Sequence, residues 1–268
     1  MINDNTLANA IKWQTRPLCC QYLVLHFEAL SVPVGEEGAA HDRTVHWPVG
    51  VLADGQCELL GAWFDPVSGA TGWEEVFEDL KVRGVEKIRF VVGDEPSEVS
   101  EGAQAAQLDT TVLPSAGRLL RQSLAQVAPR HRNTGAGALG GLCAAASAKA
   151  ARAALITLGA SPWGATNPTV VERWRVAVAR LAPFYALAPR LRRLILSGDE
   201  ATERVGRTLQ RAVARNGCFP SETAAIAFIS EVLDRVDRGF GTAGPVAARG
   251  AWNHIRGLGE GSEPACCH

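Results

Sequence analysis

The chain has 268 residues, of which 47% are hydrophobic and 21% charged, so it can bury the core of one large domain or two small ones. No stretch approaches the roughly 20 uninterrupted apolar residues of a membrane span, and residues 1–13 lack the features of a secretory signal. The seven cysteines form neither a CxxC pair nor a regular framework, which is typical of reduced thiols. We expect a globular, cytoplasmic protein with no membrane partner.

The net charge of −1 conceals a strong asymmetry along the chain. Residues 1–110 hold 18 acids and 7 bases, a net −11, whereas residues 111–268 hold 10 acids and 20 bases, a net +10. This division favours a C-terminal half that faces a polyanion and an N-terminal half whose carboxylates supply a metal site. Mutual attraction of the two halves is the alternative interpretation.

The first elements predicted along the chain are strands. Residues 19–32 are rich in apolar and β-branched side chains and predict a buried strand. Two further strands, 44–53 and 56–64, flank Asp54-Gly55, a strong hairpin signal. Apolar side chains at helical spacing predict a helix over 72–82.

Alternation of strands and helices follows. We expect strands over 87–92 and 110–113 and a helix over 118–127, with a short helix after Asp94. The resulting order, β-β-β-α-β-α-β-α, is typical of an α/β fold with a ribonuclease H-like core.

Beyond this region the pattern becomes helical. We expect a flexible glycine-rich turn at Gly135–Gly141, helices over 142–158 and 170–187, a helix over 190–215 interrupted near Ser197–Asp199, and a helix over 222–236. The predicted organisation is the first part of the core at 16–132, an α-helical insertion at 133–189, C-terminal helices completing the core at 190–237, and a flexible tail at 238–268.

Several segments in this order and spacing together resemble one known family. They are YLVLHFEALSV, the hairpin around ADG, GWEEVFEDLKVRGV, IRFVVGDEPSEV and RRLILSGDEATERVGRTLQ. Over about residues 16–235 the chain resembles the catalytic region of Mutator-family transposases of bacterial insertion sequences. The resemblance implies a ribonuclease H-like fold and an Asp, Asp, Glu triad that binds Mg²⁺ or Mn²⁺.

In such a triad, carboxylates hold two ions that promote phosphoryl transfer during DNA recombination and transposition. By the resemblance, the three catalytic positions fall on His26, Asp94 and Glu203. Imidazole is a poor Mg²⁺ ligand, so His26 implies impaired cleavage. Glu28 lies two residues further along the strand and on the same face, where it is an alternative metal ligand beside Asp94 and Glu203. A strand-end Asp94 and a helical Glu203 also have ordinary structural explanations.

Other polar positions of the family also differ in this chain. By the resemblance, Ser115 and Arg118 replace a Cys and a His, Gly206 replaces an Asn after the Glu-Arg pair, and an Asn before the catalytic Glu corresponds to Asp199 or a neighbour. These differences fit a protein that is no longer selected for cleavage.

A basic stripe is predicted from helical spacing alone. Arg204, Arg207, Arg211 and Arg215 step by three and four residues and lie on one helix face. Such a stripe suits double-stranded DNA, and an ordinary solvated face is the alternative.

Three weaker signals are set aside. The GxGxxG match within residues 135–140 follows a polar run instead of a strand, which argues against a dinucleotide site. His41 and His46 lack partners at zinc-ligand spacing. Trp163 and Trp174 could stack on a displaced base, although burial is the simpler expectation.

Two functional hypotheses remain. The first is a transposase core that binds double-stranded DNA and carries, or descends from, metal-dependent strand cleavage and transfer. The second is a catalytically inactive, transposase-derived DNA-binding or scaffolding module. A homo-oligomer is compatible with both.

Overall fold

The computed structural model describes residues 4–35, 40–65, 70–93 and 96–240. It divides into two compact units, one of Met1–Val112 with Glu200–His268 and one of Leu113–Asp199. The chain passes from one unit to the other within strand β6 and again within helix α10. In the described part, no helix is both long and apolar enough to cross a membrane, and none of the five described cysteines forms a disulfide.

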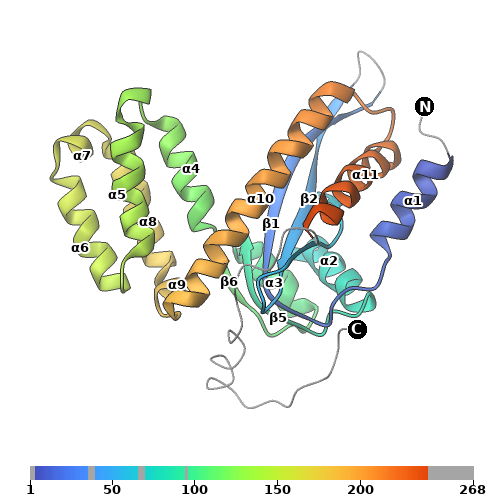
Figure 1. Cartoon of the computed structure of the whole chain (residues 1–268), viewed down its shortest axis with the longest axis horizontal. Helices are drawn as coiled ribbons and strands as arrows, with labels where there is room; N and C mark the ends of the chain where they lie inside the picture. The colour runs from blue at the N-terminus through green and yellow to red at the C-terminus, as the bar shows by residue number, and fades with distance from the viewer. Residues whose placement is uncertain (1–3, 36–39, 66–69, 94–95, 241–268) are drawn as a thin grey trace. The chain divides into compact units, whose positions relative to one another are not determined.

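The first unit is built on a mixed sheet, which places the protein in the α/β class. The strands run in the order β3-β2-β1-β5-β6, and short β4 also pairs with β2. Figure 1 labels β1, β2, β5 and β6 of this sheet. β1 is antiparallel to β2 and parallel to β5. The elements of this unit are α1 (Asp4–Gln14), β1 (Gln21–Val34), β2 (His41–Val51), β3 (Cys57–Leu59), β4 (Trp63–Phe64), α2 (Ala70–Val82), β5 (Lys87–Gly93), α3 (Pro96–Ala105), the start of β6 (Thr111–Pro114), most of α10 (Pro189–Asn216) and α11 (Glu222–Phe240).

The predicted order of strands and helices is present, with α1 as an addition. The single strand predicted over 56–64 is divided into β3 and β4, which both pair with β2. The hairpin signal is confirmed because Asp54 Oδ1 accepts a hydrogen bond from the Gln56 amide at 2.9 Å. Gly55 adopts a φ of 90°, a conformation that glycine takes without steric cost.

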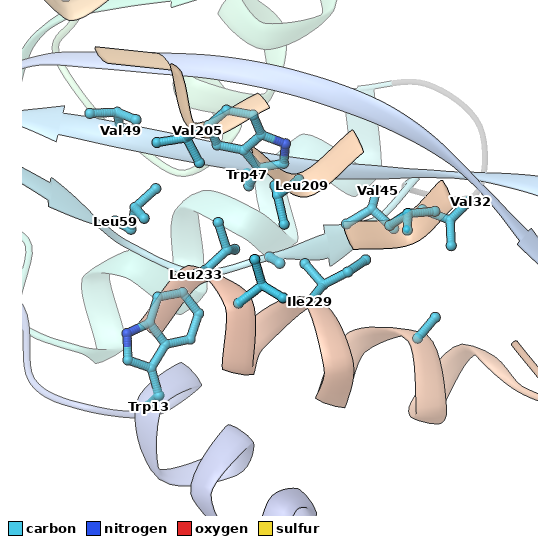
Figure 2. Packing of buried hydrophobic residues seen from close by; sticks show 14 of the residues in the cluster. Trp13, Val32, Val45, Trp47, Val49, Leu59, Val205, Leu209, Ile229 and Leu233 are labelled. Carbon is cyan, nitrogen blue, oxygen red and sulfur yellow. The ribbon is translucent and has the colours of Figure 1, made fainter. Parts of the chain in front are cut away.

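Apolar side chains cover both faces of the sheet. On one face, Phe27 makes edge-to-face contacts with Trp73 and Phe77 of α2, with ring centroids 5.0 and 5.9 Å apart. On the other face, Trp47 of β2 packs with residues of α10 and α11 (Figure 2). Since Trp47 is only 1% exposed, its burial contributes several kcal/mol, on the order of 3, to this core.

The second unit is helical. Serine hydroxyls cap three of its helices, since Ser115, Ser147 and Ser161 each accept a hydrogen bond from the amide three residues later. Its elements are the end of β6, α4 (Ala116–Gln126), η1 (Pro129–His131), α5 (Arg132–Ala144), α6 (Ala148–Gly159), α7 (Pro162–Thr166), α8 (Pro168–Arg180), α9 (Ala182–Tyr185) and the start of α10.

The prediction of a flexible turn at Gly135–Gly141 is wrong, because α5 runs through all of these residues. Leu139 and Leu142 are buried, and a Cβ on Gly135 would lie 2.7 Å from the Trp163 ring. The glycine at 135 therefore permits close packing of the helix against Trp163, and tertiary contact outweighs the low helical propensity of glycine.

Other helix boundaries also need correction. The predicted helix over 142–158 is two helices, because Ser147 caps a new start at Ala148. The helix over 170–187 likewise ends at Arg180 and is followed by α9. The predicted interruption near Ser197–Asp199 is absent, and α10 continues from Pro189 to Asn216.

Candidate functional site

The first predicted catalytic position lies in the middle of the sheet. His26 of β1 is paired in register with Val49 of β2 and Val92 of β5, and is 1% exposed. Glu28, two residues later, is half-buried and pairs in register with Trp47. Cross-strand partners share a face, so His26 and Glu28 lie on the sheet face that carries Val49 and Trp47.

The helix that carries Glu203 packs on that same face. Val205 and Leu209 of α10 are fully buried in the cluster that contains Trp47 (Figure 2). A Cβ on Gly206 would lie only 3.5 Å from the Trp47 ring. Glu203 stands at the margin of this packed face and its carboxylate accepts a hydrogen bond from Arg207 Nη1 at 2.9 Å. The structure therefore brings the helix of Glu203 onto the sheet face of His26 and Glu28.

Asp94 lies outside the described residues. The described part of β5 ends at Gly93, one residue beyond Val92, the register partner of His26. Its place along the chain is therefore next to the strand that borders His26.

The predicted arginine stripe is exposed along α10. Arg204, Arg207, Arg211 and Arg215 all face solvent, on the side of the helix opposite Val205 and Leu209. The Arg204 guanidinium lies 5.5 Å from the centre of the Phe240 ring. Burial raises the pKa of the Cys57 thiol to about 11, and the nearby Arg204 partly opposes that rise.

A polar cluster in the second unit joins two positions at which the family resemblance indicates changes. Asp199 is 4% exposed; its Oδ1 accepts a hydrogen bond from the Ser115 hydroxyl at 2.8 Å and its Oδ2 accepts one from the Gly117 amide at 3.0 Å. Ser115 Oγ in turn accepts one from the Arg118 amide. The carboxylate therefore satisfies the N-terminus of α4, where a negative charge is favoured.

This cluster also explains why α10 continues through the interruption that the sequence predicts near Ser197–Asp199. Gly and Asp within a predicted helix indicate a break when read locally. Here Asp199 projects from a continuous helix onto α4, and a Cβ on Gly117 would lie 2.7 Å from its carboxylate. The sequence signal for this contact between α10 and α4 was Ser115, the cap of α4, followed two residues later by Gly117.

Trp163 and Trp174 are buried, so packing is their observed role. The Trp163 indole donates to the His131 carbonyl at 3.1 Å, and the Trp174 indole donates to Ser123 Oγ at 2.9 Å. Their rings are therefore structural anchors of the helical unit.

At the two predicted catalytic positions that the structure describes, His26 and Glu203, the donor groups do not fit a two-ion carboxylate centre. His26 supplies a buried imidazole, which is a poor ligand for Mg²⁺, and Glu203 is already ion-paired with Arg207. Within the ranges that the structure describes, no group of three or more His, Cys, Asp or Glu residues is placed to hold a metal ion.

Positive charge is concentrated in the second unit. Residues Leu113–Asp199 contain 12 arginines and lysines and only 2 acids, Glu172 and Asp199, a net +10. The remainder of the chain holds 15 bases and 26 acids, a net −11. Since Asp199 is buried and Glu172 pairs with Arg175 at 2.9 Å, the acids of this unit cannot neutralise most of its bases.

Comparison with known families decides the classification. The family model described as "Transposase, Mutator family" matches residues 1–243. The chain belongs to the Mutator family of transposases. The most similar relatives include the transposase for insertion sequence element ISRM3 of Rhizobium meliloti (strain 1021), with 33% identity over 233 residues.

Two further relatives give comparable matches. The probable transposase for an ISRM3-like element of Sinorhizobium fredii is 32% identical over 233 residues. A probable insertion-sequence transposase of Corynebacterium diphtheriae is 31% identical over 225 residues. These matches cover 87% of this chain for the two rhizobial proteins and 84% for the third. The chain spans 58% of the length of the rhizobial relatives and 65% of the third.

Proposed function

We propose that this Mutator-family chain is a transposase core that binds double-stranded DNA and in which strand cleavage and transfer are impaired. The observation that carries the DNA-binding proposal is the net +10 of Leu113–Asp199, where 12 bases accompany only 2 acids. A duplex presents about one negative charge per 1.7 Å of its axis, so a surplus of this size gains free energy by releasing condensed counterions.

The arginine stripe of α10 is the second surface that we assign to DNA. Its four guanidinium groups are exposed, and the buried face of the same helix is held by Val205 and Leu209. Each arginine offers a planar fork of N–H donors that matches phosphate oxygens, and one helix carries all four on the same face. Arg204, Arg207, Arg211 and Arg215 are therefore proposed as phosphate contacts.

We assign a ribonuclease H-like core to residues 16–132 and 190–237 and a helical insertion to 133–189. The antiparallel β3-β2-β1 meander followed by parallel β5 supports the core assignment. The compact unit Leu113–Asp199, which contains the whole of 133–189, supports the insertion.

The impairment of cleavage rests on His26. By the family pattern, the position should carry an Asp, and the imidazole found there is buried to 1% exposure within the sheet. Asp94, Glu203 and Glu28 remain the proposed acidic positions, and Mg²⁺ or Mn²⁺ is the cofactor of an active site of this type. The same observation favours the second candidate function, a catalytically inactive DNA-binding or scaffolding module.

Replacement of two stripe arginines tests the DNA assignment. In the Arg207→Ala/Arg211→Ala variant, the slope of log affinity for duplex DNA against log salt concentration should flatten by up to about two units. The matched control is Arg235→Ala/Arg238→Ala, which removes two exposed arginines from α11. Fluorescence anisotropy with a labelled duplex measures both slopes, and equal slopes for the two variants would remove the stripe from the DNA interface.

A further inference from the structure

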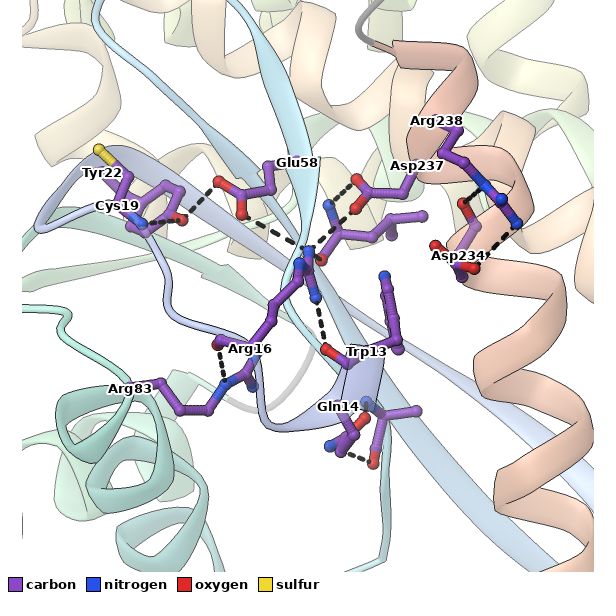
Figure 3. A network of polar contacts seen from close by, with 12 residues as sticks. Trp13, Gln14, Arg16, Cys19, Tyr22, Glu58, Arg83, Asp234, Asp237 and Arg238 are labelled. Carbon is purple, nitrogen blue, oxygen red and sulfur yellow. Dashed lines mark hydrogen bonds and ion pairs between the residues drawn. The ribbon is translucent and has the colours of Figure 1, made fainter. Parts of the chain in front are cut away.

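The free edge of the sheet in the first unit is closed by an ion pair. β3 is the outermost strand, and the backbone N–H and C=O of Leu59 point away from β2. Its N–H donates to Asp237 Oδ1 at 2.7 Å, and its carbonyl accepts from Arg16 Nη2 at 2.5 Å (Figure 3). Two side chains therefore take the hydrogen bonds that a neighbouring strand would otherwise take.

The same two side chains hold each other in place. Arg16 Nη2 lies 2.9 Å from Asp237 Oδ2, and Arg16 Nη1 donates to the Trp13 carbonyl at 2.9 Å. Glu58 Oε1 is 3.5 Å from Arg16 Nη2, and its other oxygen accepts from the Tyr22 hydroxyl at 2.7 Å. Asp237 is thus fastened at both carboxylate oxygens, one to the backbone of β3 and one to Arg16.

The fastening lies close to the end of α11. Phe240 follows Asp237 by three residues, less than one helical turn, and is 8% exposed in the core cluster. The Arg204 guanidinium lies over the Phe240 ring, 5.5 Å from its centre. Holding Asp237 against β3 therefore holds the aromatic surface on which Arg204 rests.

A neighbouring ion pair joins two residues of the same helix. Asp234 Oδ2 accepts from Arg238 Nη2 at 2.9 Å, and the Arg238 side chain is 71% exposed (Figure 3). This pair links two residues of one helix, whereas Asp237 links the helix to the sheet edge. It offers a matched control for the removal of one carboxylate from α11.

We propose that Asp237 is a positioning residue for DNA binding, which acts by fastening the end of α11 to the β3 edge so that Phe240 supports Arg204. The inference rests on the proposed role of the arginine stripe. A guanidinium that is held over an aromatic ring presents its N–H groups outward in one orientation, so a phosphate can bind it with a smaller loss of conformational freedom.

Asp237→Ala tests the proposal in the full chain. At fixed moderate salt, the Kd for a labelled 20-base-pair duplex should rise about two- to fivefold, the range of one exposed cation–π contact. Asp234→Ala should leave the Kd within error of the wild type. In an Arg204→Ala background, Asp237→Ala should cause no further loss, because the guanidinium that it positions is absent.

Two other measurements keep the proposal falsifiable if Asp237→Ala folds poorly. Asp237→Asn retains an acceptor for the Leu59 amide but loses the ion pair, and should give a smaller loss of DNA affinity. Phe240→Leu keeps an apolar side chain in the core but removes the ring, and should match Asp237→Ala. Hydrogen exchange at the Leu59 amide should accelerate in Asp237→Ala and remain unchanged in Asp234→Ala.

The outcomes separate this inference from the proposed function. If Arg204→Ala weakens DNA binding but Asp237→Ala and Phe240→Leu do not, the positioning role of Asp237 is overturned, while the assignment of the arginine stripe to DNA stands. If neither Arg204→Ala nor Arg207→Ala/Arg211→Ala alters DNA binding, the assignment of the stripe to DNA is wrong. Loss of affinity that is equal in wild-type and Arg204→Ala backgrounds also overturns the positioning role, since the effect would then not pass through Arg204.

Discussion

The two units of this protein contrast in charge and in how they are packed. The unit with the sheet is acidic, and large apolar side chains cover both faces of its strands. The helical unit, Leu113–Asp199, is strongly basic, and its buried side chains are mainly leucine and valine with a few aromatic rings. In the first unit carboxylates and guanidinium groups pair in a network, as around Arg16, whereas the second has too few acids to do so. An unbalanced surface of this kind is stabilised by an external polyanion.

The largest expected effect tests whether the helical unit depends on its few aromatic anchors. Trp174 is fully buried, and its indole donates to Ser123 Oγ. Trp174→Ala should therefore cost about 3–5 kcal/mol of unfolding free energy, because it leaves a cavity and an unpaired buried hydroxyl. Urea unfolding followed by circular dichroism measures this loss; a cost below about 1 kcal/mol would show that the core repacks freely.

The next prediction concerns close helix packing in the same unit. At Gly117 a Cβ would meet the Asp199 carboxylate at 2.7 Å, so Gly117→Ala should destabilise by about 1–3 kcal/mol. The matched control is Gly137→Ala in α5, where nothing lies within 4 Å. Since alanine is the better helix former, this control should stabilise by up to about 1 kcal/mol. Thermal melts of both variants should shift in opposite directions, and shifts of the same sign would contradict the packing argument.

A third prediction tests whether His26, in the acidic unit, occupies a metal-ligand position. His26→Asp would add a third carboxylate beside the positions proposed for Asp94 and Glu203, and repulsion should destabilise the metal-free protein. Millimolar Mn²⁺ should then restore stability by about 1.4 kcal/mol if its concentration is tenfold above Kd. Identical responses of wild type and variant to Mn²⁺ in thermal melts would show that His26 does not occupy a metal-ligand position.

The smallest expected effect concerns the paired carboxylates of the acidic unit. Burial raises the pKa of Glu58 above its ordinary 4.5, an effect that the Tyr22 hydroxyl and Arg16 only partly oppose. The folded state therefore binds a proton more readily than the unfolded state, and this contribution to stability is lost as pH rises through the raised pKa. Relative to Glu58→Gln, the wild type should lose unfolding free energy between acid and neutral pH. Parallel stability profiles of the two proteins would contradict the burial argument.

The sequence predicted the sheet unit better than the helical unit, for physical reasons. Alternating and continuous apolar runs, such as residues 19–32, identify strands because a strand buries whole faces. The glycines of α5 and the Ser197–Asp199 segment indicated breaks because their local propensity is poor, yet contacts with Trp163 and α4 keep both helices continuous. Local pattern contains no information about such long-range contacts.

The candidate site was predictable only in part. Periodicity alone placed the four arginines on one exposed face of α10, and resemblance placed His26 and Glu203 on elements that pack together. The Arg16–Asp237 closure joins residues 221 positions apart, and the sequence offers no spacing signal for it. Similarly, Asp199 and Ser115 are 84 positions apart and meet only through tertiary packing.

The most direct test of the account compares the two units with equal changes of charge. Lys149→Ala/Arg152→Ala removes two exposed bases from the helical unit, and Lys12→Ala/Lys87→Ala removes two exposed bases from the sheet unit. Duplex affinity measured across salt concentrations should show a slope reduced by up to about two units in the first variant and a wild-type slope in the second. Equal slopes in the two variants, or wild-type binding that does not depend on salt, would contradict the proposal that the basic helical unit binds DNA.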